Sequence, residues 1–275
     1  MSDASVKGVG GFVASVAGTQ VTLQSQLPEQ LFVASSTCRE AAGMHSLLQA
    51  LLLNPDWRSR LEHRTVRILT DNQGVAADMQ KTRGCHSVFT YVAQMYQLAA
   101  AHDVELIVEW RPRECDALQY ADLHSKFVDV GDWRVAQAAY VSLCEQWQVQ
   151  PVVDWFARPW SAKCDIFYCQ FLMPGAAGVN VFDHCWALPD GRFSYICPPQ
   201  MLVAKVLSKV LEDRVTCVLI LPAWYKAWHG LLKLLPVQAE SRLPASVVQW
   251  GDRAPEAGQR SSALMAGLRA YKVVF

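Results

Sequence analysis

The sequence predicts a mixed α/β protein that folds as two units. Segments with the alternation of β-strands recur between segments whose apolar residues have helical spacing. The chain of 275 residues is too long for one minimal domain and short for three. Hydrophobic residues make up 52% of the chain and charged residues 18%, which excludes a disordered polyelectrolyte. Lys and Arg together number 25, as do Asp and Glu, so the overall charge does not indicate a strongly basic nucleic-acid clamp.

We divide the chain into four segments. They are an α/β domain at residues 1–131, a helical connector at 132–150, a second small α/β domain at 151–236 and a loose tail at 237–275. The tail is rich in Pro, Ala, Ser, Gly and charge up to residue 262, and a final strand is expected at residues 268–275.

The first domain begins with strands and a long helix. A residual strand around Asp3 precedes residues 11–17 and 19–23, which alternate like a tight hairpin. Ser36 or Thr37 can cap the helix that follows, and proline in Asn54-Pro55 ends it. The apolar residues of this helix recur at helical spacing: Ala41, Met44, Leu47, Leu48, Leu51 and Leu52.

Strands and helices then alternate to the end of this domain. The expected elements are a strand at residues 66–70, a helix at 88–101, a strand at 104–110 and a helix at 118–128. This order predicts one mixed sheet with flanking helices.

Four carboxylates occupy informative positions in these elements. Asp3 precedes the hairpin, Glu40 leans toward the sheet-facing side of the long helix, Asp71 ends a strand and Asp122 lies early in a helix. Clustered carboxylates repel one another, so cations would have to neutralise them. Hard divalent cations such as Mg²⁺ or Mn²⁺ take oxygen ligands, and two such ions about 4 Å apart stabilise the attacking and leaving oxygens in phosphodiester cleavage.

The sequence around these acids resembles the four catalytic blocks of ribonuclease H domains in retroelement reverse transcriptases. Gly84 and Ser87, after the third block, are also similar to the retroelement subgroup. The four matching segments are Ser2-Asp3-Ala4-Ser5, Cys38-Arg39-Glu40-Ala41-Ala42, Leu69-Thr70-Asp71-Asn72 and Tyr120-Ala121-Asp122-Leu123-His124-Ser125-Lys126.

This resemblance implies a ribonuclease H-like fold and a reaction. Asp3, Glu40, Asp71 and Asp122 would be the catalytic residues and would hold Mg²⁺ or Mn²⁺. The substrate would be an RNA–DNA hybrid, whose RNA strand is hydrolysed by activated water and which is recognised by its backbone and 2′-hydroxyl groups.

Some positions depart from the family pattern. Only Met1 and Ser2 precede Asp3, so the resemblance implies that an upstream reverse transcriptase polymerase domain supplies most of the central strand. Asp116 stands where an Asn is common in the family. We interpret His124 as a surface residue of its helix rather than a catalytic histidine.

The C-terminal half predicts a second small, Rossmann-like α/β domain. The expected elements are a strand at residues 152–157 that carries Asp154, a strand at 193–196, a helix at 202–211 and a strand at 215–221. Eight of the ten tryptophans lie at or after Trp133, and we expect most of them to anchor the core rather than to stack on bases.

This half resembles the Dam-like adenine methyltransferase region that follows ribonuclease H in DIRS-type retrotransposons. The methyltransferase site is expected to be degenerate, because Cys197 replaces a polar residue, Gln200 replaces an aromatic one, and no Gly-rich loop follows Asp154. The matching segments are Gly131-Asp132-Trp133, Val153-Asp154-Trp155-Phe156-Ala157, Ala162-Lys163, Gly178-Val179-Asn180-Val181-Phe182, Trp186, Pro198-Pro199 and Pro222-Ala223-Trp224.

The cysteines and apolar runs bear on location. Nine cysteines without a secretory leader predict reduced thiols in the cytoplasm or nucleus, and the longest apolar run, residues 215–224, is too short to predict a membrane partner. We expect buried thiols; the alternative is a zinc site made from Cys164, Cys169, His184, Cys185 and Cys197.

Two other functions stay open at this point. One is a non-catalytic, nucleic-acid-binding remnant of a retroelement polyprotein, which the short first strand and the neutral charge favour. The other is an active adenine-specific DNA methyltransferase, which requires residues that the sequence lacks.

Overall fold

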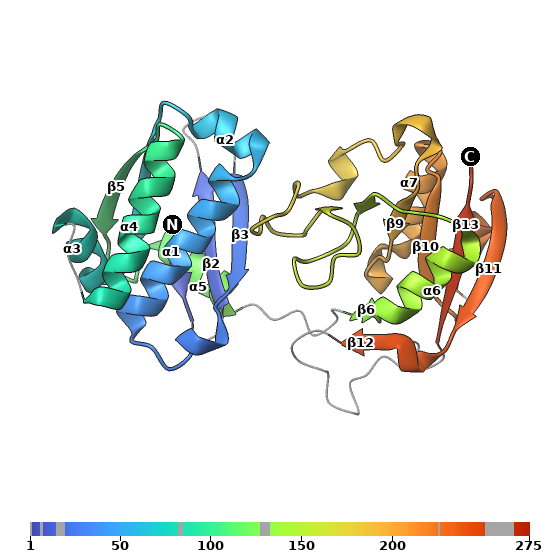
Figure 1. The fold of residues 1–275 in the computed structure, drawn as a ribbon, viewed down its shortest axis with the longest axis horizontal. Helices are drawn as coiled ribbons and strands as arrows, with labels where there is room; N and C mark the ends of the chain where they lie inside the picture. The colour runs from blue at the N-terminus through green and yellow to red at the C-terminus, as the bar shows by residue number, and fades with distance from the viewer. Residues whose placement is uncertain are drawn as a thin grey trace. The chain divides into compact units, whose positions relative to one another are not determined.

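The computed structural model describes residues 2–5, 8–14, 20–81, 85–126, 133–224, 226–250 and 267–275. The chain divides into two compact units, Met1–Phe127 with Phe171–Ala176 and Val128–Gln170 with Ala177–Phe275 (Figure 1). Each unit combines strands and helices, so the predicted mixed α/β class is confirmed. Several sequence expectations lie outside the described residues: the hairpin turn at 17–19, Gly84, Gly131-Asp132 and the tail at 251–262.

Unit 1 contains five strands and five helices among its described residues. Its elements are β1 (Ser2–Ala4), β2 (Gly8–Ala14), β3 (Gln20–Gln26), α1 (Ser36–Leu52), α2 (Pro55–Leu61), β4 (Thr65–Thr70), α3 (Gln73–Lys81), α4 (His86–Ala101), β5 (Glu105–Trp110) and α5 (Asp116–Lys126).

The described strands of unit 1 form two separate sheets, β1-β2-β3 and β4-β5, rather than the single mixed sheet that the sequence predicts. β2 pairs antiparallel with both β1 and β3, and β4 pairs in parallel with β5. Within the described residues no ladder joins β1 to β4. The three residues of β1 are paired with β2.

Helices α1 and α5 cover opposite faces of the β1-β2-β3 sheet. A Cβ atom at Gly10 of β2 would lie 2.2 Å from the backbone nitrogen of Ser125 in α5, and one at Gly8 would lie 2.5 Å from its carbonyl oxygen. On the other face, a Cβ at Gly43 of α1 would lie 2.9 Å from Val9. Successive strand residues point to opposite faces, so the glycines let α5 approach while Val9 meets α1.

Helix ends in unit 1 follow their capping residues. Ser35, not Ser36 or Thr37, caps α1, because its hydroxyl accepts a hydrogen bond from the Cys38 amide at 3.2 Å. α1 ends at Leu52, as the proline signal predicts, and Asn54 then caps α2 by accepting from the Trp57 amide. Helices α2 and α3, which have seven and nine residues, are not predicted by the sequence pattern.

Unit 2 is built around a six-stranded sheet with the strand order β11-β13-β10-β9-β7-β8. The pairs among β7, β8, β9 and β10 are parallel, and β13 runs antiparallel to both β10 and β11. Its elements are β6 (Trp133–Val135), α6 (Gln137–Trp147), β7 (Val153–Asp154), β8 (Ile166–Phe167), β9 (Ser194–Ile196), α7 (Val203–Glu212), β10 (Cys217–Pro222), α8 (His229–Leu232), β11 (Val237–Leu243), β12 (Val248–Trp250) and β13 (Leu268–Val273).

The helix expected in the connector is present as α6, but it begins only at Gln137, because residues 133–135 form the short strand β6, which pairs with β12. The expectation of a loose tail is wrong at residues 237–243, which form β11 and pair with β13 in the main sheet. The final strand expected at the C-terminus is confirmed as β13.

Both faces of strand β10 are covered. Leu219 and Leu221 lie in a core with α7, whereas Val218 and Ile220 lie in a core with Tyr140 of α6. This alternation explains why β10 is a continuous apolar run, since both of its faces are buried. In the described residues, no helix is both long and apolar enough to span a bilayer.

Candidate metal centre

Three acidic side chains converge in unit 1. Asp3 comes from β1, Glu40 from α1 and Asp71 from the residue that follows β4. One carboxylate oxygen from each lies within 4.8 Å of the others. In the described part of the chain, no other group of His, Cys, Asp or Glu side chains is close enough to hold a metal ion. The zinc alternative therefore fails on geometry, because its cysteines and histidine do not come together.

Glu40 connects the ends of two strands that share no ladder. Its Oε2 accepts a hydrogen bond from the Ala4 amide at 2.9 Å, and its Oε1 accepts one from the Thr70 hydroxyl at 3.4 Å. Ala4 ends β1 and Thr70 ends β4, so Glu40 brings the flanking Asp3 and Asp71 to the same edge.

Helix α5, on the face of the sheet opposite to α1, holds Asp3 in place. The Ser125 hydroxyl donates to its Oδ2 at 2.8 Å and also lies 2.9 Å from the Asp122 carbonyl oxygen. Asp3 is paired with Gly10 in the β1-β2 ladder and is 8% exposed. Both the ladder and the serine therefore fix where this carboxylate points.

Asp122 is not part of the triad, although the sequence analysis grouped all four acids. Two cations hold its carboxylate: Arg113 Nη2 lies 2.8 Å and Lys126 Nζ 2.6 Å from its Oδ1. Burial favours a raised pKa for Asp122, but the hydrogen bonds from Lys126 and Arg113 outweigh burial and lower it. Arg113 Nε also lies 3.7 Å from Oδ2 of Asp71, so this arginine spans the space between Asp122 and the triad.

The triad carries unfavourable charge when no cation is present. Burial, and then the charges of Asp3 and Asp71, raise the pKa of Glu40 to about 8. Burial also raises the pKa of Asp3, against the hydrogen bond from Ser125 that favours its charged form. A divalent cation would relieve this repulsion, and carboxylate oxygens are the ligands that Mg²⁺ and Mn²⁺ take. The residues present therefore fit such an ion.

Sequence reasoning missed the basic and hydroxyl groups around the acids. Arg113 lies in the loop before α5, where neither periodicity nor a motif marks it. Ser125 lies within a family-like segment but was not given a role. His124, expected at the surface, is half-buried between Tyr120 and Phe171, with ring centroids 4.4 and 5.2 Å away.

Unit 1 is thus a mixed α/β structure with an acidic site suited to a divalent cation. No protein-family model and no curated protein matches the sequence. Among solved structures, RNase H1 from the halophilic archaeon Halobacterium salinarum NRC-1 is similar, with a TM-score of 0.34 and 15% sequence identity. The alignment covers 42% of this chain and 80% of that chain. A similarity this low carries no functional argument, so the proposal below rests on the site itself.

Proposed function

We propose that unit 1 hydrolyses the RNA strand of RNA–DNA hybrids in a reaction that requires Mg²⁺ or Mn²⁺. The observation that carries the proposal is the convergence of Asp3, Glu40 and Asp71, with their oxygens within 4.8 Å and the pKa of Glu40 raised to about 8. Buried acids that repel one another are costly unless a cation balances them, and perturbed pKa values of this kind cluster at functional sites.

Each residue has a distinct part in this proposal. Asp3, Glu40 and Asp71 hold the cation, and Asp122 joins them when Arg113 and Lys126 turn toward other anions. A bound divalent ion would polarise a phosphate oxygen and lower the pKa of a bound water molecule. Ser125 and Thr70 are positioning residues, because they donate to Asp3 and Glu40 and fix the orientation of those carboxylates.

The substrate must bring anions to this edge of unit 1. Arg113 and Lys126 are more than half exposed, with side-chain exposures of 62% and 57%. A nucleic-acid phosphate can therefore reach both cations, and phosphate contacts position a duplex without reading its sequence. Discrimination of a hybrid from duplex DNA then depends on the 2′-hydroxyl groups and the shape of the minor groove.

A substitution in the triad tests the reaction. With Mg²⁺ present, the wild-type protein should nick a labelled RNA–DNA hybrid and leave duplex DNA intact, and Asp71→Asn should remove this activity because a neutral amide is a poorer cation ligand. Asp56→Asn is the matched control, since Asp56 is exposed on α2 and lies outside the triad. Equal cleavage by wild type and Asp71→Asn would assign the activity to a contaminating nuclease.

The rival function is a non-catalytic nucleic-acid-binding remnant. The ion pairs of Asp122 with Arg113 and Lys126 favour it, because a neutralised acid is a weaker metal ligand. Hybrid binding that survives Asp71→Asn, with no cleavage by the wild type at any Mg²⁺ or Mn²⁺ concentration, would support this reading. From the resemblance of the sequence we also propose that the protein derives from a retroelement and that an upstream reverse transcriptase polymerase domain is its partner.

For unit 2 we propose a degenerate Dam-like domain that does not bind S-adenosylmethionine. Both carboxylate oxygens of Asp154 are already engaged: Oδ1 accepts from the Phe156 amide at 3.2 Å and Oδ2 from the Lys163 amide at 3.0 Å. Cys197 is buried and its thiol is a weak hydrogen-bonding group. Calorimetry should detect no binding of S-adenosylmethionine; saturable micromolar binding would make a methyltransferase the leading interpretation of this unit.

A further inference from the structure

Unit 1 contains a short segment that comes from the second half of the sequence. Residues 171–176 cluster with residues 1–127, whereas the residues on either side of them in the chain belong to unit 2. The predicted second domain, residues 151–236, included this segment. Leu172 has no exposed surface, so the segment is packed against the protein rather than lying on it as a loop.

The segment extends the β1-β2-β3 sheet at the outer edge of β3. The Leu172 amide donates a hydrogen bond to the Thr22 carbonyl oxygen at 2.9 Å, and the Leu172 carbonyl oxygen accepts one from the Gln24 amide at 3.1 Å. This is the pattern of a parallel pair, in which Leu172 lies opposite Leu23. The backbone groups of an edge strand require partners, and Leu172 supplies two of them to β3.

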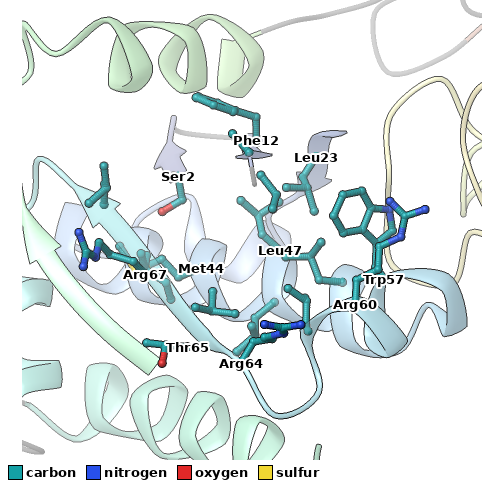
Figure 2. Close-up of a pocket in the computed structure, with 18 of the residues that line it drawn as sticks. Ser2, Phe12, Leu23, Met44, Leu47, Trp57, Arg60, Arg64, Thr65 and Arg67 are labelled. Carbon is teal, nitrogen blue, oxygen red and sulfur yellow. The ribbon is translucent and has the colours of Figure 1, made fainter. Parts of the chain in front are cut away.

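Side chains of this segment reach both faces of the sheet. Leu23 lines a pocket together with Leu47 of α1, as Figure 2 shows. Leu172 pairs with Leu23 and therefore points to the same face. Phe171 points to the other face, because successive strand residues alternate, and its ring centroid lies 5.2 Å from that of His124 in α5.

The far end of the segment is anchored beside α2. Asn54 Nδ2 donates a hydrogen bond to the Ala176 carbonyl oxygen at 3.2 Å, and Asn54 Oδ1 accepts one from the Trp57 amide in the first turn of α2. Asn54 is buried, so water does not compete for these bonds. The segment is thus held by β3 at one end and by Asn54 at the other.

The two β3 residues that pair with the segment also contact helix α5. The Thr22 hydroxyl lies 3.2 Å from the Tyr120 hydroxyl, and Gln24 Nε2 donates to the His124 carbonyl oxygen at 3.3 Å. His124 Nδ1 is buried and has no hydrogen-bond partner among the described residues, so the rings of Tyr120 and Phe171 hold the imidazole by packing. A displacement of the segment would therefore reach α5 both through β3 and through the Phe171 ring.

Helix α5 in turn carries groups that the proposed metal centre uses. Asp122 lies between Tyr120 and His124 in the sequence, and Ser125 donates to Asp3 Oδ2 at 2.8 Å. Backbone hydrogen bonds link each helical residue to the one four positions away, so a shift at His124 is passed to its neighbours in the helix. About 1 Å of misplacement at such a site can cost on the order of a hundredfold in rate.

From these contacts we infer that residues 171–176 position the metal centre of unit 1. Phe171 packs on α5, and the backbone of the segment holds β3, which together fix Ser125 and Asp122 relative to Asp3. Phe171 is thus a positioning residue, because it acts through His124 and its helix. The inference rests on the proposed cation site and gives a segment of the second half a part in the reaction. The predicted first domain alone would keep all four acids but lose this support.

Substitution of Phe171 in the full chain tests this role. Phe171→Ala removes the ring that packs on His124 and leaves the backbone pairing of Leu172 in place. Isothermal titration calorimetry should show Mn²⁺ binding weakened from a few-fold to about tenfold, since residues that orient ligands affect metal affinity strongly. Amide hydrogen exchange at residues 120–126 should become faster. Phe171→Tyr, which keeps an aromatic ring, should restore both.

Val92→Ala is the matched control. Val92 is buried in α4, so its truncation lowers the free energy of unfolding without removing a contact that holds α5. It should leave Mn²⁺ affinity and the exchange of residues 120–126 unchanged in the folded protein. Wild-type Mn²⁺ affinity in Phe171→Ala, or an equal loss in Val92→Ala, would overturn the positioning role and leave the proposed function intact.

A double-mutant cycle tests the route through His124. The losses of Mn²⁺ affinity in Phe171→Ala and His124→Ala should not add, because each substitution removes the same ring contact. Fully additive losses would overturn the inference, since the two residues would then act independently. A wild-type protein that binds no Mn²⁺ and cleaves no hybrid would instead overturn the proposed function, and the positioning role with it.

Discussion

Glu40 in unit 1 and Asp154 in unit 2 are both buried acids near the ends of strands, yet their surroundings differ. Their exposed fractions are 5% and 2%, and burial raises the pKa of Glu40 to about 8 and that of Asp154 to about 6. The two oxygens of Asp154 accept from the backbone amides of Phe156 and Lys163. Glu40 also accepts two hydrogen bonds, but it faces two further carboxylates.

The comparison separates a structural acid from a candidate ligand. Asp154 closes a turn, and its charge meets amide donors and the nearby Lys163. Glu40 meets the like charges of Asp3 and Asp71, which add to its burial. Burial alone therefore does not distinguish a metal site; what distinguishes it is a set of acids that only a cation can balance.

The largest expected effect is on stability as a function of pH without divalent ions. The folded state binds the Glu40 proton more tightly than the unfolded state, so the free energy of unfolding should fall as the pH rises from about 4.5 to about 8. The loss should reach a few kcal/mol, since each pKa unit corresponds to about 1.4 kcal/mol. Denaturant titrations should show that Glu40→Gln flattens this decline.

Asp154 supplies the matched comparison in the same titrations. Its pKa is raised from 3.8 to about 6. Its contribution to stability should therefore be lost as the pH rises from about 4 to about 6, a lower range than that of Glu40. Adding Mn²⁺ should restore stability above pH 8 in wild type and in Asp154→Asn but not in Glu40→Gln. Restoration in all three proteins would mean that the ion binds elsewhere.

A second effect concerns metal affinity itself. Glu40→Gln should weaken Mn²⁺ binding by about a hundredfold, because it removes a charged ligand from a small set, whereas Asp154→Asn should leave it unchanged. Isothermal titration calorimetry measures both. Similar losses in the two variants would show that the difference between the two acids has been misread.

The smallest effect concerns the arginine beside the acids. Arg113→Met should strengthen Mn²⁺ binding a few-fold, because the guanidinium lies 2.8 Å from Asp122 and 3.7 Å from Asp71 and competes with the ion for their charge. The pair is exposed to solvent, so the gain is limited by screening. Calorimetry at low and at high salt should show a larger gain at low salt. Weaker binding in Arg113→Met would assign this arginine a supporting role instead.

The order of the strands and the longer helices in unit 1 could be predicted because local patterns encode it. The apolar spacing of α1 and the alternation of β4 and β5 are visible in short windows of sequence. The meeting of Asp3, Glu40 and Asp71 followed from the resemblance, since their separation along the chain hides it from local patterns. The division of the described strands into two sheets could not be predicted, because pairing between β1 and β4 depends on contacts that no local pattern records.

Unit 2 shows the other limit of sequence reasoning. β11 has the polar, charged composition of a loop because it is the edge strand of its sheet and is mostly exposed. Its partner β13 lies about thirty residues away, with Val237 paired to Val273, so a local window sees only half of the pair. Arg113 escaped notice for a similar reason, since its acidic partners come from two other elements.

Among the described residues β4 pairs only with β5, which bears on how the protein behaves in concentrated solution. A strand edge is a template for edge-to-edge aggregation, which natural proteins oppose with charged residues on the edge. Arg64, which is exposed, immediately precedes β4. When two copies approach through their β4 edges, this arginine brings like charges together, which is unfavourable for directly opposed strands. Its charge thus opposes edge-to-edge pairing, and this protection weakens as salt rises.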